Sequence, residues 1–72
     1  MAIRVLLIDD DLQILPFLQK GLAFEEFEVY TAVDGESGLV AAKQYQPHLV
    51  LLDIAMPGLD GFEVCRRLWL QV

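Results

Sequence analysis

The sequence predicts an α/β fold built on a small parallel sheet, and three observations support it. Residues 3–8 (IRVLLI), which are apolar apart from Arg4, and residues 49–52 (LVLL) are runs of strand length that are typical of strands covered on both faces. Segments with helical spacing of apolar residues lie between the strands, and turn-forming residues mark the boundaries. Because strands that alternate with helices are joined by crossover connections, we expect a βαβαβα chain with parallel strands.

The first predicted strand, residues 3–8, leads into the first helix. Asp11 can cap that helix, which we expect to run to about Ala23. Pro16 lacks a backbone donor and crowds the carbonyl four residues earlier, so it should lie in or near the first turn, with regular helix from about Leu15. The inner face of the helix carries apolar side chains at helical spacing, namely Leu15, Leu18 and Leu22.

The second predicted strand, residues 27–32, is short and partly polar, so it belongs at an edge of the sheet. Asp34 can cap the helix that follows, which should continue to about Tyr45 and end before Pro47. Helical spacing predicts that the inner face of this helix consists of Leu39, Ala42 and Tyr45.

The third predicted strand, residues 49–52, ends at Asp53, and a turn signal at residues 56–58 (Met-Pro-Gly) separates it from a third helix. Right-handed crossover connections leave few arrangements for three parallel strands. We place the polar second strand outside, the first strand in the middle and the third strand on its other side. The predicted strand order is therefore 2-1-3.

Composition and charge exclude several classes of function. A chain of 72 residues makes at most one small domain, and 56% hydrophobic residues is more than such a domain needs, which indicates a missing remainder or a partner. The net charge of −6 argues against a nucleic-acid surface. The lone Cys65 excludes an internal disulfide and fits a reducing compartment, and no apolar run has the length of a membrane span. We expect a cytoplasmic protein with no membrane or nucleic-acid contact.

Three acidic side chains are predicted to converge at one edge of the sheet. In the order 2-1-3 the first and third strands are neighbours, so their carboxyl ends bring Asp9 and Asp10 beside Asp53. Open α/β sheets bind their ligands at this edge. Carboxylates that repel one another stay ionised when a cation is bound, and hard oxygen ligands suit Mg²⁺ or Mn²⁺. A carboxylate beside such an ion can also act as a nucleophile toward phosphorus.

The segments IRVLLIDDD and LVLLDIAMPGLDGFEVCRRL resemble the receiver domain of bacterial two-component response regulators, which has a flavodoxin-like fold. The resemblance covers the whole chain and implies a regulatory domain, rather than an enzyme, that is phosphorylated by a sensor histidine kinase. It implies that Asp53 is the phosphoacceptor, and that Asp9, Asp10 and Asp53 form a metal site in which Asp10 is a direct ligand. It also implies loop and metal roles for further residues: a backbone carbonyl ligand at Ala55, a shaped loop at Pro57 and Gly58, and the start of the third helix at Gly61.

The chain departs from the receiver pattern in its extent. A receiver has five βα units in the strand order 2-1-3-4-5, whereas residues 1–72 supply three. The hydroxyl residue after the fourth strand and the lysine after the fifth strand are absent, and both contact the phosphoryl group in the family. We therefore expect an incomplete receiver domain that is impaired in switching. His48 replaces the usual aspartate before the third strand, and we expect it to be an exposed residue without a chemical role.

Two other functions compete with the phosphoacceptor. An aspartate-nucleophile phosphatase needs a second aspartate two residues after the nucleophile, and Ala55 occupies that position. A self-associating half-domain without phosphotransfer is the stronger alternative, because the third strand and the Leu68–Leu70 segment would expose apolar surface. We expect a homodimer in which two third strands pair antiparallel in the order 2-1-3-3-1-2, with helix packing through Trp69 or strand exchange as the other geometries.

Overall fold

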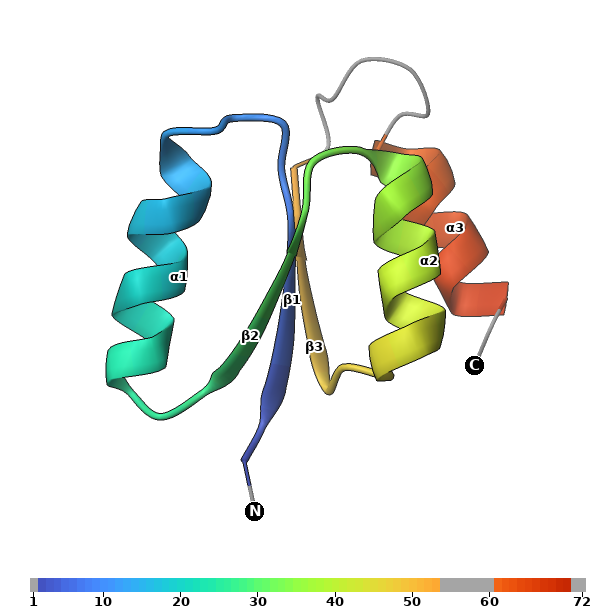
Figure 1. Cartoon of the computed structure of the whole chain (residues 1–72). Coiled ribbons are helices and arrows are strands. Elements are labelled where there is room, and N and C mark those ends of the chain that lie inside the picture. Colours follow the sequence, from blue (N-terminus) through green and yellow to red (C-terminus); the bar gives the residue numbers. More distant parts are fainter. Residues whose placement is uncertain (1, 54–60, 71–72) are drawn as a thin grey trace.

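The computed structural model describes residues 2–53 and 61–70, and these residues form a three-stranded sheet with helices on both faces (Figure 1). All strand pairs are parallel and the strand order is β2-β1-β3, as predicted. Helix α1 lies on one face of the sheet, and α2 and α3 lie side by side on the other (Figure 1). In chain order the elements are β1 (Arg4–Ile8), α1 (Ile14–Phe24), β2 (Glu28–Ala32), α2 (Gly35–Tyr45), β3 (Leu49–Leu52) and α3 (Gly61–Leu70).

Strand β1 is the centre of the core on both faces of the sheet. Its last four residues, Val5 to Ile8, are all buried, because helices cover both sides of this central strand. Successive side chains point to opposite faces. Leu6 and Ile8 therefore pack with Val64 of α3, and Val5 and Leu7 pack with Leu15 of α1. The prediction that the first strand is covered on both faces is confirmed.

Strand β3 is covered on one face only, so the prediction that it is buried on both faces is wrong. Val50 and Leu52 are half-buried on the side of α2 and α3, whereas Leu49 and Leu51 are 49% and 41% exposed. Their register partners on β1, Val5 and Leu7, lie under α1. Helix α1 packs over β1 and β2, and so this face of β3 stays open.

Helix α1 begins later than its predicted cap. The Asp11 carboxylate accepts the backbone N–H groups of Gln13 at 2.9 Å and Ile14 at 3.2 Å, so Asp11 caps a turn that precedes the helix. The helix itself starts at Ile14, which places Pro16 in the first turn, where the missing donor costs no helical hydrogen bond. The predicted inner face is confirmed, since Leu15 is buried and Leu18 and Leu22 pack against it.

Helix α2 begins at its predicted cap, and its inner face includes small residues that the sequence did not indicate. The Asp34 carboxylate accepts the Ser37 backbone N–H at 2.7 Å, and this hydrogen bond lowers the pKa of Asp34. The buried residues of α2 are small, namely Gly35, Gly38 and Ala41, so the helix lies close to the sheet. Leu39 and Ala42 are partly buried as predicted, while Tyr45 stacks on Tyr30 of β2 with ring centroids 4.0 Å apart.

Arg4 and His48 join the amino ends of β1 and β3. The His48 backbone N–H donates to the Arg4 carbonyl at 2.8 Å, and the Arg4 backbone N–H donates to Nδ1 of His48 at 2.9 Å. The Arg4 guanidinium also donates to the Tyr45 and Gln46 carbonyls at the end of α2. His48 is exposed as predicted, but it has a structural role that the sequence did not indicate.

Candidate functional site

The candidate site lies where the carboxyl ends of β1 and β3 meet. Asp9 follows β1 and Asp53 follows β3, and the backbone ladder continues through both residues. The Asp53 N–H donates to the Ile8 carbonyl, and the Asp9 N–H donates to the Ala32 carbonyl, each at 3.0 Å. These hydrogen bonds place both aspartates at the same edge of the sheet, which is the upper edge in Figure 1.

The predicted carboxylate cluster is present. Asp9, Asp10 and Asp53 each offer a carboxylate oxygen, and these three oxygens lie within 4.8 Å of one another. Asp9 and Asp53 are half-buried, and Asp10 is exposed. At such separations three ionised carboxylates repel one another, and a divalent cation offsets that repulsion.

The donor set fits Mg²⁺ better than a softer metal. All three side chains supply hard oxygen ligands, and the partial exposure of the cluster leaves room for the water ligands that Mg²⁺ retains. The Asp9 carboxylate also accepts the Asp11 backbone N–H at 2.9 Å, which fixes its orientation. Ala55, Pro57 and Gly58 lie outside the described residues, and Gly61 begins α3 as predicted.

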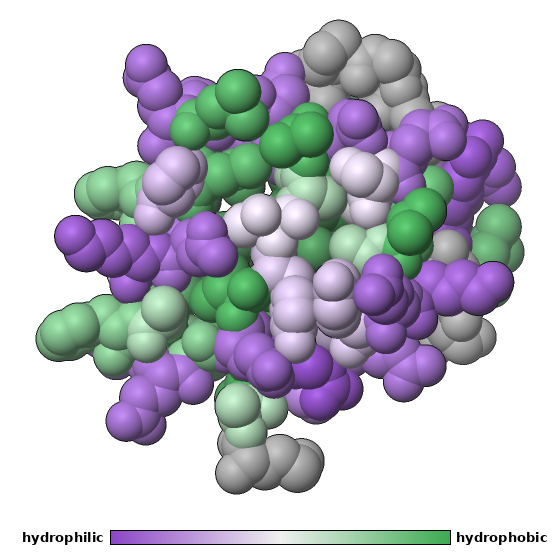
Figure 2. Space-filling view, viewed as in Figure 1, coloured by the Kyte–Doolittle hydropathy of each residue, from purple (hydrophilic) through white to green (hydrophobic). Residues whose placement is uncertain are grey.

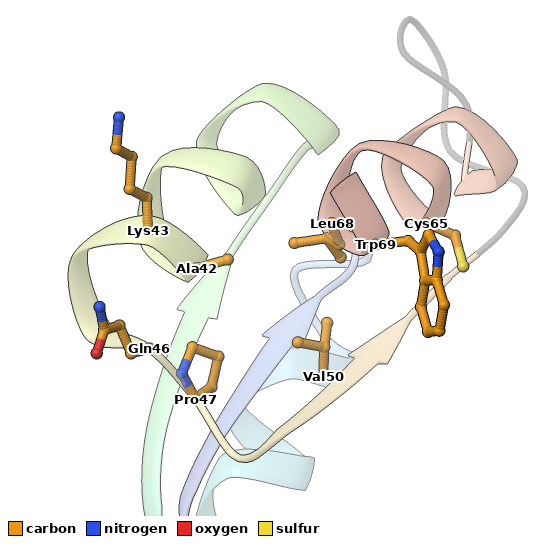
Figure 3. A pocket seen from close by; sticks show the side chains of 8 residues that line it. All are labelled: Ala42, Lys43, Gln46, Pro47, Val50, Cys65, Leu68 and Trp69. Atoms are coloured by element: carbon orange, nitrogen blue, oxygen red, sulfur yellow. The ribbon is translucent and has the colours of Figure 1, made fainter. Parts of the chain in front are cut away.

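One side of the cluster borders an apolar hollow of about 250 Å³ under α1. Its walls include Leu7, Leu15, Leu18 and Leu51, and Asp9 and Asp53 stand at its edge. A larger hollow of about 830 Å³, which we call the α2–α3 groove, lies between those two helices and has Val50, Leu68 and Trp69 among its lining residues (Figure 3). No carboxylate lines the α2–α3 groove in the part of the chain that is described, so the carboxylate cluster is the candidate site for metal binding.

The sequence reasoning missed Arg4 and His48 as positioning residues. Their paired hydrogen bonds join the amino ends of β1 and β3, and that pairing places Asp53 beside Asp9 at the other end. A lone cation at the start of a buried strand was the available signal. The role of this cation depends on which carbonyl groups the fold brings near it, and the sequence alone does not show which groups these are.

Comparison with known proteins identifies the family. The response regulator receiver domain model matches residues 5–71. The chain is 44% identical over 68 residues to the response regulator PleD of Caulobacter vibrioides, covering 94% of this chain and 15% of that protein. It is 48% identical over 65 residues to the transcriptional regulatory protein PrrA of Mycobacterium tuberculosis, covering 90% of this chain and 28% of that protein.

Comparison with solved structures supports the same family. The structure of the chemotaxis protein CheY4 of Vibrio cholerae superposes with a TM-score of 0.95 at 30% identity, covering 99% of this chain and 59% of that one. The chain therefore belongs to the response regulator receiver domain family, whose members are regulatory proteins of two-component signalling. It spans less than a third of these two curated relatives. Among the described residues no helix combines the length and apolarity required to cross a membrane.

Proposed function

We propose that this chain is a phosphoacceptor module of two-component signalling, and that Asp53 receives the phosphoryl group from a sensor histidine kinase. The observation that carries the proposal is the convergence of Asp53 with Asp9 and Asp10 at one edge of a receiver fold. An Asp53 carboxylate oxygen attacks phosphorus, the bond from phosphorus to the donor breaks, and an acyl phosphate forms. The donor leaves with the electron pair of the broken bond, so no external oxidant or reductant is needed.

The cation proposed for this site is Mg²⁺, or Mn²⁺ in its place. Asp10 and Asp53 are the direct ligands among the described residues, Asp9 completes the acidic pocket, and the resemblance adds the backbone carbonyl of Ala55. When bound, the ion offsets the charge on the phosphoryl oxygens during transfer. Asp9 and Asp10 would therefore contribute to the reaction by holding the positive charge of the cation next to Asp53.

The 72-residue chain on its own should be a slow acceptor. We propose that residues 1–72 act as an incomplete receiver domain, without the hydroxyl and lysine that contact the phosphoryl group in the family. Loss of one such donor costs roughly 10²–10³ in rate. In the family, the contacts of the hydroxyl and the lysine with the phosphoryl group also carry the conformational switch. Residues 1–72 on their own should therefore switch poorly. We infer a cytoplasmic location, consistent with a lone Cys65 in a reducing compartment.

The proposal is tested by incubation with acetyl phosphate and Mg²⁺, followed by intact mass measurement. The expected result is a gain of one phosphoryl group that depends on Mg²⁺ and disappears in Asp53→Asn. Glu25→Gln is the matched control, because it removes one acidic charge at the opposite end of the molecule, after α1. An adduct that persists in Asp53→Asn would contradict the assignment, and so would modification as fast as that of a five-unit receiver.

A self-associating half-domain without phosphotransfer is the second candidate function, and the exposed leucines of β3 favour it. In that case the chain would form dimers through the third strand and third helix and would gain no mass from acetyl phosphate. The same incubation therefore separates the two candidates. Self-association and phosphorylation are also compatible in one molecule.

A further inference from the structure

The first backbone donor of β1 is bonded to a side chain. The Arg4 N–H donates to Nδ1 of His48 at 2.9 Å, and the His48 N–H donates to the Arg4 carbonyl at 2.8 Å. In a regular parallel ladder the N–H and the carbonyl both bond to the backbone of the neighbouring strand. Here the Gln46 carbonyl, two residues before His48, accepts the Arg4 guanidinium at 2.9 Å. The His48 imidazole therefore takes the place of a backbone acceptor at the start of the sheet.

The backbone before β3 fixes the imidazole in this position. Gln46 lies in the left-handed region with a φ of 49°, and Pro47 follows it with a restricted φ and no N–H. The chain turns there from α2 toward β3, and His48 is the last residue before the strand. Backbone and side chain of His48 thus both bond to Arg4. We call this pair of hydrogen bonds the Arg4–His48 junction.

The Arg4–His48 junction requires a neutral imidazole. A ring nitrogen that accepts a hydrogen bond carries no proton, so the proton of the neutral ring is on Nε2. Both ring nitrogens of a protonated histidine are donors, and Nδ1 would then face the Arg4 N–H as donor to donor. Histidine is the side chain that ordinarily changes charge between about pH 5 and 8. Mild acid therefore removes the acceptor on which the junction depends.

The neighbours of His48 offer little to hold a protonated ring in place. Among the described residues no salt bridge involves His48, and the residue is exposed. Hydrophilic residues lie along the lower margin of the molecule in Figure 2, where the strands begin, so protons reach this end from solvent. The charged group in contact with His48 is Arg4, and its guanidinium already places one positive charge at this end of the sheet.

The acidic groups of the adjoining elements are placed elsewhere. Glu28, the register partner of Arg4 on β2, lies on the other side of β1 from β3. Glu63 of α3 is paired with Arg66 and Arg67. The other titratable groups of the elements at this end are Lys43 and Tyr45 of α2, Tyr30 of β2, Lys20 of α1, and Glu25 and Glu26 between α1 and β2.

We propose that His48 makes the junction of β1 and β3 sensitive to pH, because the neutral ring holds the start of β3 to β1 and the protonated ring releases it. The contribution of this hydrogen bond to stability is complete while the ring is neutral and is lost as the pH falls from about 8 to 5. The junction lies at the opposite end of β3 from Asp53, so acid loosens the strand that carries this carboxylate. The inference does not depend on phosphoryl transfer.

The first test follows hydrogen exchange of the Arg4 amide by NMR between about pH 8 and 5, as a protection factor corrected for intrinsic exchange. In the wild type we expect protection to fall roughly fivefold, the equilibrium equivalent of one hydrogen bond. His48→Asn is the matched control, because its Oδ1 can accept the same N–H and does not titrate, so its protection should stay constant. His48→Ala should show low protection throughout. Constant protection in the wild type would overturn the proposal.

The second test compares the unfolding equilibrium constants of the wild type and His48→Ala by urea denaturation over the same pH range. At about pH 8 the wild type should be roughly fivefold more stable, and at about pH 5 the two proteins should be equal. The ratio cancels the titration of the carboxylates, which both proteins share. A wild-type advantage that persists at the acid end, or no advantage at the alkaline end, would contradict the proposal. Circular dichroism confirms that each variant is folded.

Discussion

Gly38 of α2 lies directly against the side chain of Ile8 at the end of β1. A Cβ atom built on Gly38 would lie 2.5 Å from Cδ1 of Ile8 and 3.0 Å from its Cγ1. Ile8 is fully buried and comes immediately before Asp9. The close approach of α2 to the sheet therefore packs Ile8 in place, directly before Asp9 of the carboxylate cluster.

Gly38→Ala should destabilise the fold, although alanine favours helix more than glycine does. Because Ile8 is fully buried and the added Cβ would lie only 2.5 Å from its Cδ1, overpacking should cost about 1–3 kcal/mol, which exceeds the gain of up to ~1 kcal/mol in helix propensity. Gly21→Ala in α1 is the control, because nothing lies within 4 Å of a Cβ there, and it should stabilise the protein. Urea denaturation of both variants checks this, and a stabilised Gly38→Ala would show that α2 can move away from β1.

The sequence was sufficient to predict the fold class and the strand order. Apolar runs and helical spacing are local signals that indicate the strands and helices. The right-handedness of crossover connections then restricts the strand order. The meeting of Asp9, Asp10 and Asp53 also followed, because topology alone places the ends of neighbouring parallel strands together.

Other features depend on tertiary distances that no local pattern contains. The open face of β3 depends on how far α1 reaches across the sheet, and the inner face of α2 depends on how close that helix lies to Ile8. The roles of Arg4 and His48 depend on carbonyl groups about forty residues away in the chain. For the same reason, periodicity predicted Tyr45 on the inner face of α2 but could not predict that its ring stacks on Tyr30 of β2.

Replacement of Asp10 should weaken metal binding and stabilise the metal-free protein. Asp10→Asn removes one full charge next to the cation, which should lower Mn²⁺ affinity at least roughly tenfold. It also relieves repulsion among the three carboxylates when no cation is bound. Water-proton relaxation with Mn²⁺ measures the affinity, and thermal unfolding with a chelator measures the stability. Glu25→Gln should change neither, and unchanged affinity in Asp10→Asn would place the cation elsewhere.

The ion pairs of α3 should make stability depend on pH in the acid range. Arg66 and Arg67 donate to the Glu63 carboxylate and lower its pKa from 4.5 to about 2. A group whose pKa is lower in the folded state contributes stability above its unfolded pKa, and that contribution is lost as the pH falls from about 4.5 toward 2. Urea denaturation at several pH values in this range should show a steeper loss for the wild type than for Glu63→Gln. Equal slopes for the two proteins would show that the ion pairs do not form in solution.

The most direct test of the central claim is to locate the phosphoryl group within the chain. After incubation with acetyl phosphate and Mg²⁺, borohydride reduction converts an aspartyl phosphate into homoserine, which peptide mass spectrometry locates. The account predicts homoserine at position 53, its loss when Mg²⁺ is chelated, and much less of it in Asp10→Asn. Homoserine at Asp9 or Asp10, or an undiminished signal at position 53 without a divalent cation, would contradict it.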